Sequence, residues 1–194
     1  DGTSDIAYDE NNTAYVYLSD NATRSKSLTV SGSTLNLCLN GKTLTGSITV
    51  KGDATLNICD CKGGGEIKKT SACAVEVRTV SSSNVRTTLN LYGGKISSNR
   101  ISSYANGSIV LYNNDGNNAQ TVAVFNMYGG EVYNGDSGSS AVYVSPANIY
   151  TGYYELNMHG GSICCEKNNG FALNDNENVT MKITGGTITS GNYG

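Results

Sequence analysis

The chain has 194 residues, of which 38% are hydrophobic, with 24 glycines, 13 tyrosines, six cysteines, one proline and a net charge of −3. Its 13 lysines and arginines form no long basic run, which argues against a nucleic-acid partner. No run of ~18 apolar residues occurs, so no membrane-spanning helix is expected. Turn-forming, β-branched and aromatic residues without helical periodicity predict an all-β protein.

The predicted strands are short and begin near the N-terminus. Residues 1–13 are polar and acidic, and we expect them to form a leading segment or an N-terminal cap. Ala14–Leu18 is the first predicted strand, and further short strands follow between Leu28 and Cys59, separated by Gly, Ser, Asp or Asn. Such short strands with frequent turns favour a β-helix over a sandwich. We expect residues 14–194 to form one β-helix domain, continuous with further domains of a larger protein.

One motif recurs along the chain, with the form apolar-Asn-apolar-x-Gly-Gly-x-apolar. Full or near-full copies occupy Leu89–Ile96, Phe125–Val132, Leu156–Ile163 and Met181–Ile188. Degenerate copies occupy Leu35–Cys38 and Leu56–Cys59. The spacing between successive copies varies from 21 to 36 residues. Repeats of this size with variable loops predict a three-faced parallel β-helix of about six coils. The glycine pair is expected to adopt a backbone conformation that residues with a Cβ resist.

Aligned copies of the motif sort core residues from surface residues, because side chains alternate along a strand. Two inward columns lie in the first strand of the motif and a third follows the glycines. Their members are Leu35, Leu56, Leu89, Phe125, Leu156 and Met181; Leu37, Ile58, Leu91, Met127, Met158 and Ile183; and Ile67, Ile96, Val132, Ile163 and Ile188. Third-face strands are expected at Ala74–Val77, Ile109–Leu111, Ala141–Val144 and Phe171–Leu173.

The segment Leu37–Gly46, followed by Ile48–Val50 and Ala54–Ile58, resembles a recurrent opening of right-handed, pectate-lyase-like β-helix modules. These modules occur in large secreted or wall-anchored surface proteins of Gram-positive bacteria. The later Asn-Met-Tyr-Gly-Gly units resemble their body repeats, so the resemblance covers residues 14–191. It implies a right-handed coil and a secreted or cell-surface location. The wider class includes polysaccharide lyases, glycosidases, adhesins and spacers, so the resemblance does not choose an activity.

Two outward columns are the best candidates for a binding strip. An asparagine lies between the two inward positions of most copies, and the next outward position carries Tyr or His in three of them. The stacked amides either hydrogen-bond along the helix axis or bind sugar hydroxyls. The aromatic rings either stack on sugar rings or support each other across strands. The predicted ligand-binding residues are Asn90, Tyr92, Asn126, Tyr128, Asn157 and His159.

Catalytic chemistry is the alternative. Glu66, Lys95 and Glu131 follow the glycine corners, and lyases of this fold use an Arg or Lys base beside acidic, calcium-binding side chains. The same order of charges fits a surface ion-pair ladder. No two carboxylates are aligned at the ~6.5–9.5 Å that an inverting glycosidase needs. His159, the only histidine, has no neighbouring Cys or Asp in its motif, so no metal site is expected there.

The leading prediction is therefore a non-catalytic extracellular module without cofactor or metal. It would act as an adhesive or glycan-binding segment, or as a rigid stalk, with a glycan or another cell-surface ligand as its partner. The alternative is a polysaccharide lyase or glycoside hydrolase.

The six cysteines are candidates for disulfide bridges or a zinc site. Cys38 and Cys59 occupy equivalent positions in adjacent coils, within the Cα distance that a disulfide permits. We expect either a Cys38–Cys59 bridge or a bridge from Cys59 or Cys61 to Cys73. The vicinal pair Cys164-Cys165 either bridges or turns one thiol into the core. Cys59, Asp60 and Cys61 lack a fourth ligand for zinc.

Overall fold

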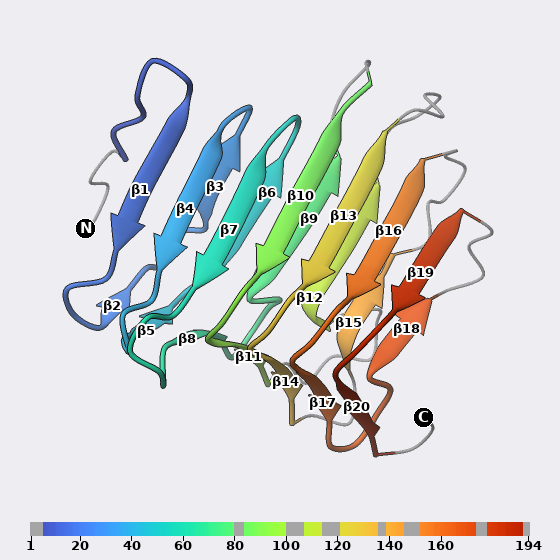
Figure 1. Cartoon of the computed structure of the whole chain (residues 1–194). Helices are drawn as coiled ribbons and strands as arrows, with labels where there is room; N and C mark the ends of the chain where they lie inside the picture. Colours follow the sequence, from blue (N-terminus) through green and yellow to red (C-terminus); the bar gives the residue numbers. More distant parts are fainter. Residues whose placement is uncertain are drawn as a thin grey trace.

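The structure is a computed structural model that describes residues 6–79, 84–99, 107–113, 121–135, 139–145, 152–173 and 178–191. The described residues form twenty strands and no helix (Figure 1). Sheet A contains β1 (Thr13–Tyr17), β4 (Thr34–Cys38), β7 (Thr55–Cys59), β10 (Arg86–Leu91), β13 (Val122–Met127), β16 (Tyr153–Met158) and β19 (Val179–Ile183). Sheet B contains β2 (Ala22–Thr23), β5 (Thr43–Thr45), β8 (Glu66–Lys69), β11 (Lys95–Ser98), β14 (Glu131–Asn134), β17 (Ser162–Cys165) and β20 (Thr187–Ser190). Sheet C contains β3 (Leu28–Ser31), β6 (Ile48–Lys51), β9 (Val75–Thr79), β12 (Gly107–Asn113), β15 (Ser140–Val144) and β18 (Phe171–Leu173).

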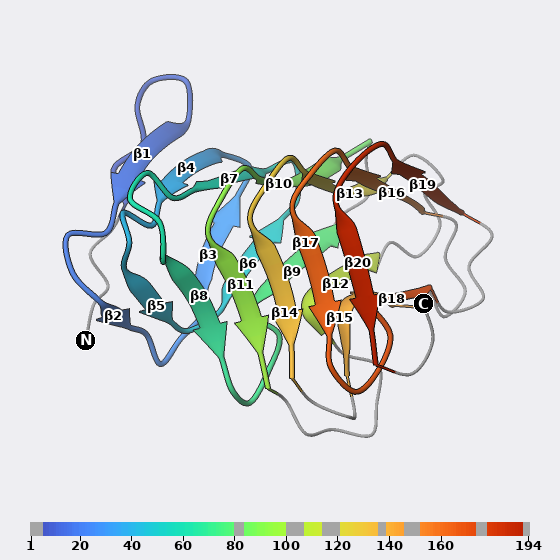
Figure 2. The same ribbon diagram turned by 60° about the horizontal axis from the view of Figure 1, so that its bottom comes forward.

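Each coil of the chain contributes one strand to each sheet in turn. Strand pairing is parallel throughout the three sheets, as between β10 and β13 or β12 and β15. Figure 2, turned to bring sheet B forward, shows sheet C behind it. Because sheets A and B have seven strands and sheet C has six, the described residues make six complete coils and two strands of a seventh. The predicted fold, a three-faced right-handed parallel β-helix of about six coils, is confirmed.

The inward columns are in the predicted register. Leu89 pairs with Leu56 on one side and Phe125 on the other, and the same alignment continues to Leu156 and Met181. These columns and the inward residues of sheet C form one continuous core. Burial of each such side chain contributes roughly 1.5–3 kcal/mol before the loss of chain entropy is counted. The coil from β1 to β3 lacks the full motif but joins the ladder, since Ala14 pairs with Leu35.

The two glycines of each corner are required for different reasons. The second glycine has a left-handed backbone, with φ of 81° at Gly130 and 83° at Gly161. The first glycine lies against the preceding coil: a Cβ on Gly129 would sit 2.6 Å from the carbonyl oxygen of Tyr92. The predicted conformational role therefore holds for the second glycine of these two corners, which also lies against the preceding coil, while the first is required for this close approach alone.

The two ends of the solenoid differ. Ile6 and Tyr8 pack against the core at the N-terminal end. At the other end, the inward side chains Ile183 and Ile188 are exposed, because no described coil lies beyond β19 and β20.

Candidate binding face

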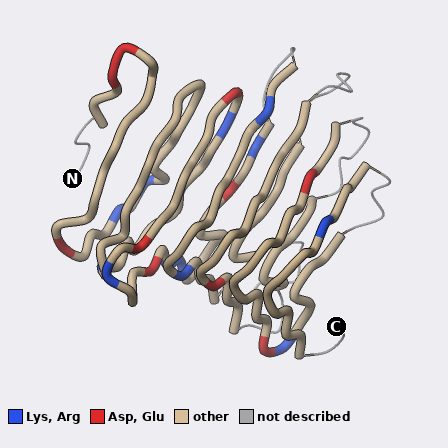
Figure 3. Tube along the Cα trace, in the orientation of Figure 1, with Lys and Arg blue, Asp and Glu red and all other residues tan. Residues whose placement is uncertain are grey.

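The outward side of sheet A carries the predicted strip. Its seven strands lie side by side, and outward positions align into columns that run along the solenoid axis (Figure 1). One column begins with Thr13, Thr34, Thr55 and Thr88, and the next contains the asparagines. Within these strands the charged residues are Arg86, Glu155 and Lys182, and Figure 3 shows how few they are. The face is therefore polar but nearly uncharged.

The asparagines form a continuous hydrogen-bonded ladder. Asn36 Nδ2 donates to the Ala14 carbonyl oxygen, and from Asn57 onward each side-chain Nδ2 donates to the Oδ1 of the asparagine in the preceding coil. The distances are 2.8 Å from Asn57 to Asn36, 2.7 Å from Asn90 to Asn57, 2.8 Å from Asn126 to Asn90 and 2.9 Å from Asn157 to Asn126. The predicted axial hydrogen bonding is confirmed. It uses one N–H and one lone pair of each inner amide, and each amide has a further N–H and lone pair to offer.

The aromatic residues stack on one another. The ring centroids of Tyr92 and Tyr128 are 4.9 Å apart with 7° between the planes, and those of Tyr128 and His159 are 5.1 Å apart with 10° between the planes. His159 Nδ1 also lies 3.0 Å from the hydroxyl of Thr184. The predicted mutual support of the rings is confirmed. Because the facing surfaces of the rings cover each other, this row presents ring edges to solvent, so a ligand meets edges where the sequence suggested ring faces.

Two tyrosines that belong to the strip were not predicted from the motif. Tyr15 and Tyr17 in β1 align with Asn36 and Cys38 of β4, so they begin the asparagine and aromatic columns. They are 80% and 67% exposed. The signal was present in the alternation of Ala14-Tyr-Val-Tyr17, which matches that of Leu35-Asn-Leu-Cys38, but this coil lacks the glycine corner that defined the motif.

In the part of the chain that the structure describes, exposed tyrosines are confined to this face. Among the described residues, the exposed tyrosines all lie on the outward side of sheet A or directly after its strands: Tyr15, Tyr17, Tyr92, Tyr128 and Tyr153. Tyrosine provides a large, rigid contact area together with a hydroxyl group, and it is enriched at binding surfaces. The concentration of these side chains on one of three faces distinguishes sheet A from sheets B and C.

An ion pair between Arg86 and Glu155 lies on the outward face of sheet A. The guanidinium of Arg86 makes two hydrogen bonds to the carboxylate of Glu155, at 2.9 and 2.5 Å, across the intervening strand β13. The hydrogen bond from Arg86 lowers the pKa of Glu155 against the opposing effect of burial. Both side chains are partly exposed, so the pair adds little to stability.

The charged column of sheet B is an interaction network. Lys95 Nζ lies 3.2 Å from Glu131 Oε1 and 4.1 Å from the centre of the Tyr133 ring. Ser97 donates a hydrogen bond of 2.6 Å to Glu66. The Lys95–Glu131 contact fits the interpretation of the column as an ion-pair ladder, whereas Glu66 is bonded to a serine. Within the described residues, no group of three His, Cys, Asp or Glu side chains could hold a metal ion.

The cysteines are arranged differently from the predicted pairs. Cys38 and Cys59 are in register, as expected, but the thiol that lies 3.0 Å from Cys38 Sγ is Cys61 Sγ. No disulfide joins any of the six cysteines, all of which lie in the described ranges. Cys165 is buried and donates to the Ser139 carbonyl at 3.3 Å, whereas Cys164 points outward from β17. The hypothesis that one thiol of the vicinal pair enters the core is confirmed.

Asp60 links two coils by hydrogen bonds at the corner beside these thiols. Its carboxylate accepts hydrogen bonds of 2.7 Å from the backbone N–H groups of Gly41 and Gly65, which belong to different coils. Burial alone would raise the pKa of Asp60, but the hydrogen bonds from Gly65 and Gly41 outweigh burial and lower the pKa below its ordinary value of 3.8. The carboxylate form is thus the one that the fold favours.

Asp60→Asn is expected to lower the free energy of unfolding by about 1.5–3 kcal/mol at neutral pH, because hydrogen bonds to a charged acceptor are weakened. A depressed pKa contributes stability above the pKa of the unfolded chain, and this contribution is lost as pH falls through the folded-state pKa. The difference between the parent protein and Asp60→Asn should therefore shrink below about pH 4. Urea unfolding at neutral and acidic pH measures it. Exposed Asp53 supplies the control Asp53→Asn, and equal losses in both variants would contradict the prediction.

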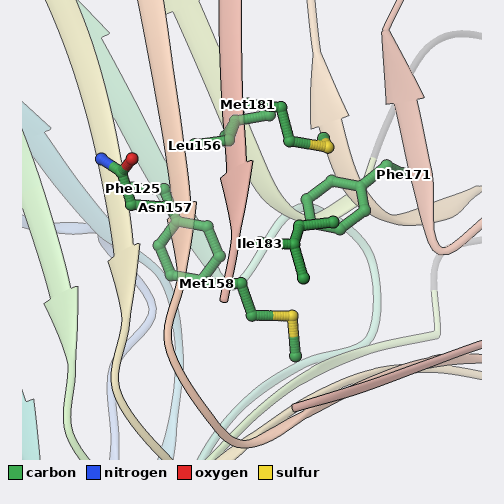
Figure 4. Close-up of a pocket in the computed structure, with 7 residues that line it drawn as sticks. All are labelled: Phe125, Leu156, Asn157, Met158, Phe171, Met181 and Ile183. Atoms are coloured by element: carbon green, nitrogen blue, oxygen red, sulfur yellow. The ribbon is translucent and has the colours of Figure 1, made fainter. Parts of the chain in front are cut away.

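A hollow lies at the C-terminal end of the solenoid, away from the strip on sheet A. Figure 4 shows apolar side chains from three successive coils converging there: Phe125, Leu156, Met158, Phe171, Met181 and Ile183, with Asn157 beside them. An adjoining recess of about 320 Å³ extends to Ile188 and Ser190. The apolar residues of this set lie at inward positions, so the recess is the uncovered end of the core. The polar side chains that line the recess are those of Asn169 and Ser190.

Comparison with known proteins identifies no relative: the chain matches no family model, no curated protein and no solved structure. The described residues also contain no helix that is long and apolar enough to span a membrane.

Proposed function

We propose that this chain is a non-catalytic extracellular module that binds a neutral glycan along the outward face of sheet A. The observation that carries the proposal is that the exposed tyrosines of the described ranges all lie on this face. The resemblance of the repeats to β-helix modules of Gram-positive surface proteins supports the location and an adhesive role.

The face repeats its chemistry once per strand. Adjacent strands are ~4.8 Å apart, so an extended polymer lying along the solenoid axis meets amides and phenol hydroxyls at a regular interval. The asparagine ladder holds the amides in fixed orientations, which reduces the entropy lost on binding. In this arrangement Tyr92 and Tyr128 offer hydroxyl groups and ring edges, while Tyr15 and Tyr17 offer exposed ring faces that can stack on a sugar.

The charges of the face favour a neutral ligand. An anionic polymer such as pectin or heparin would need a row of cations, and the strands of sheet A carry only Arg86 and Lys182 within their described ranges. Arg86 is already paired with Glu155. Hydroxyl-rich neutral chains need no such charges, because amides and phenols can both donate and accept hydrogen bonds.

Two double variants test the face. Tyr15→Ala/Tyr17→Ala and Tyr92→Ala/Tyr128→Ala should each weaken binding to neutral polysaccharides by about tenfold, since truncation of a contacting aromatic residue commonly costs more than 1 kcal/mol. Affinity electrophoresis in gels that contain xylan, mannan or β-glucan measures the change, with pectin and heparin gels for comparison. Tyr112→Ala/Tyr133→Ala is the matched control, because it removes the same groups from sheets C and B.

Binding that survives both sheet A variants would exclude this face. Retardation only by the anionic gels would contradict the neutral-ligand proposal, and no retardation by any polymer would favour a spacer. The enzymatic alternative is tested on the same polysaccharides by the release of reducing or unsaturated sugars.

A further inference from the structure

Three thiols meet at one corner of the solenoid, between the second and third coils. Cys38 ends β4, Cys59 ends β7, and Cys61 follows β7 by two residues. The Sγ atoms of Cys38 and Cys61 are 3.0 Å apart, and Cys61 Sγ lies 3.7 Å from Asn40 Oδ1. Cys59 and Cys61 are exposed and Cys38 is partly exposed, so reagents in solution can reach this group. The glycan-binding proposal does not use these thiols.

Strand geometry explains why Cys38 approaches Cys61 and not its in-register neighbour. Side chains at aligned positions of parallel strands are separated by about the strand spacing, ~4.8 Å. A disulfide requires Cβ atoms ~3.5–4.5 Å apart, slightly less than this spacing, so a Cys38–Cys59 bridge would have to draw the two strands together. Cys61 has left the strand, and its side chain can turn back toward the preceding coil.

The position of Cys61 is held by the surrounding corner. Asp60 accepts hydrogen bonds from Gly41 of the second coil and from Gly65 of the third coil, both at 2.7 Å. Gly41 also lies so close to this turn that a Cβ placed on it would be 3.1 Å from the carbonyl oxygen of Gly63. The turn that carries Cys61 is therefore fastened to the turn that follows Cys38.

We propose that Cys38 and Cys61 form a disulfide that cross-links the second and third coils, and that Cys59 stays a thiol. The oxidant is a low-molecular-weight disulfide such as oxidised glutathione. The Cys38 thiolate attacks one sulfur of the reagent, whose S–S bond breaks and releases the first glutathione thiolate. The Cys61 thiolate then attacks Cys38 Sγ and displaces the second glutathione. Two protons and two electrons thus leave the protein, and one disulfide reagent becomes two thiols.

The electrostatics of the group support this order of attack. The hydrogen bond with the Cys61 thiol lowers the pKa of Cys38. Burial, together with the neighbouring Cys38, raises the pKa of Cys59 to about 11. Since the thiolate is the reacting form, Cys38 is the best first nucleophile. The hydrogen bond with Cys38 raises the pKa of Cys61, so Cys61 acts second, through its proximity to Cys38 Sγ.

Peptide mapping of the full chain tests the proposal. The protein is incubated with oxidised glutathione, alkylated with iodoacetamide, and digested without reduction by trypsin and a protease that cleaves before aspartate. Asp60 separates the two nearby cysteines, so that Cys61 falls in residues 60–62 and Cys59 in residues 53–59. Mass spectrometry should find residues 60–62 linked to the Cys38 peptide and alkylated Cys59. Oxidation should also raise the midpoint of thermal unfolding.

Two variants distinguish this pair from other thiol chemistry. Cys59→Ser should form the linked peptide and show the same thermal shift, whereas Cys61→Ser should do neither. A Cys38–Cys59 link in the parent protein would overturn the proposal. So would alkylation of all three thiols after oxidation, or a thermal shift of equal size in Cys61→Ser.

Discussion

Phe125→Ala is expected to lower the free energy of unfolding by about 3–5 kcal/mol, the range for large-to-small changes in a packed core. Phe125 is 2% exposed and lies in the middle of its column, between Leu89 and Leu156. Coils on both sides prevent collapse of the cavity, because each strand is held by two neighbours. Since domains are typically stable by only 5–15 kcal/mol, the loss should be evident in urea unfolding followed by circular dichroism.

Ile183→Ala is the comparison for this experiment. Ile183 occupies an inward column in the last described coil, but it is 48% exposed. Its truncation should therefore cost about 1 kcal/mol or less, because little apolar area leaves the core. A loss as large as that of Phe125→Ala would show that the C-terminal end is covered in solution, by a further coil or a second molecule.

Gly130→Ala is expected to be the second most damaging change. The left-handed backbone at φ 81° costs roughly 1–2 kcal/mol for a residue with a Cβ. The added Cβ would also lie 2.5 Å from the carbonyl oxygen of Gly94, and displacing this backbone costs about 1–3 kcal/mol more. The sum exceeds that of most surface substitutions, and thermal unfolding would report it as a lower midpoint.

The variant Gly63→Ala separates the cost of the left-handed backbone from the cost of the close contact between coils. Gly63 has a similar φ of 78°, but a Cβ at this position would meet nothing within 4 Å. Gly63→Ala should therefore carry only the conformational penalty, about 1–2 kcal/mol. If both variants lose the same stability, close approach between coils at Gly130 is not what requires a glycine there.

The sequence determined the coil and its core. A side chain in a parallel β-helix has equivalents in the coils on either side, so motif alignment alone predicts the neighbours of Leu89 or Ile96. Strand alternation then assigns inward and outward positions. The same reasoning placed the asparagines and the aromatic row in columns, and both columns have the predicted contacts along the axis.

Only the tertiary structure decided the contacts that do not follow from the alignment of the motif copies. Ring orientation is not set by register, so the stacking of Tyr92 on Tyr128, which hides their facing surfaces, could not be predicted from the motif. Tyr15 and Tyr17 joined the face through strand pairing of a coil that lacks the glycines. Cys61 stands outside any strand, and its approach to Cys38 depends on how Asp60 fastens two turns. Alignment therefore predicts contacts within the ladders, whereas contacts made by turns and rotamers require the folded chain.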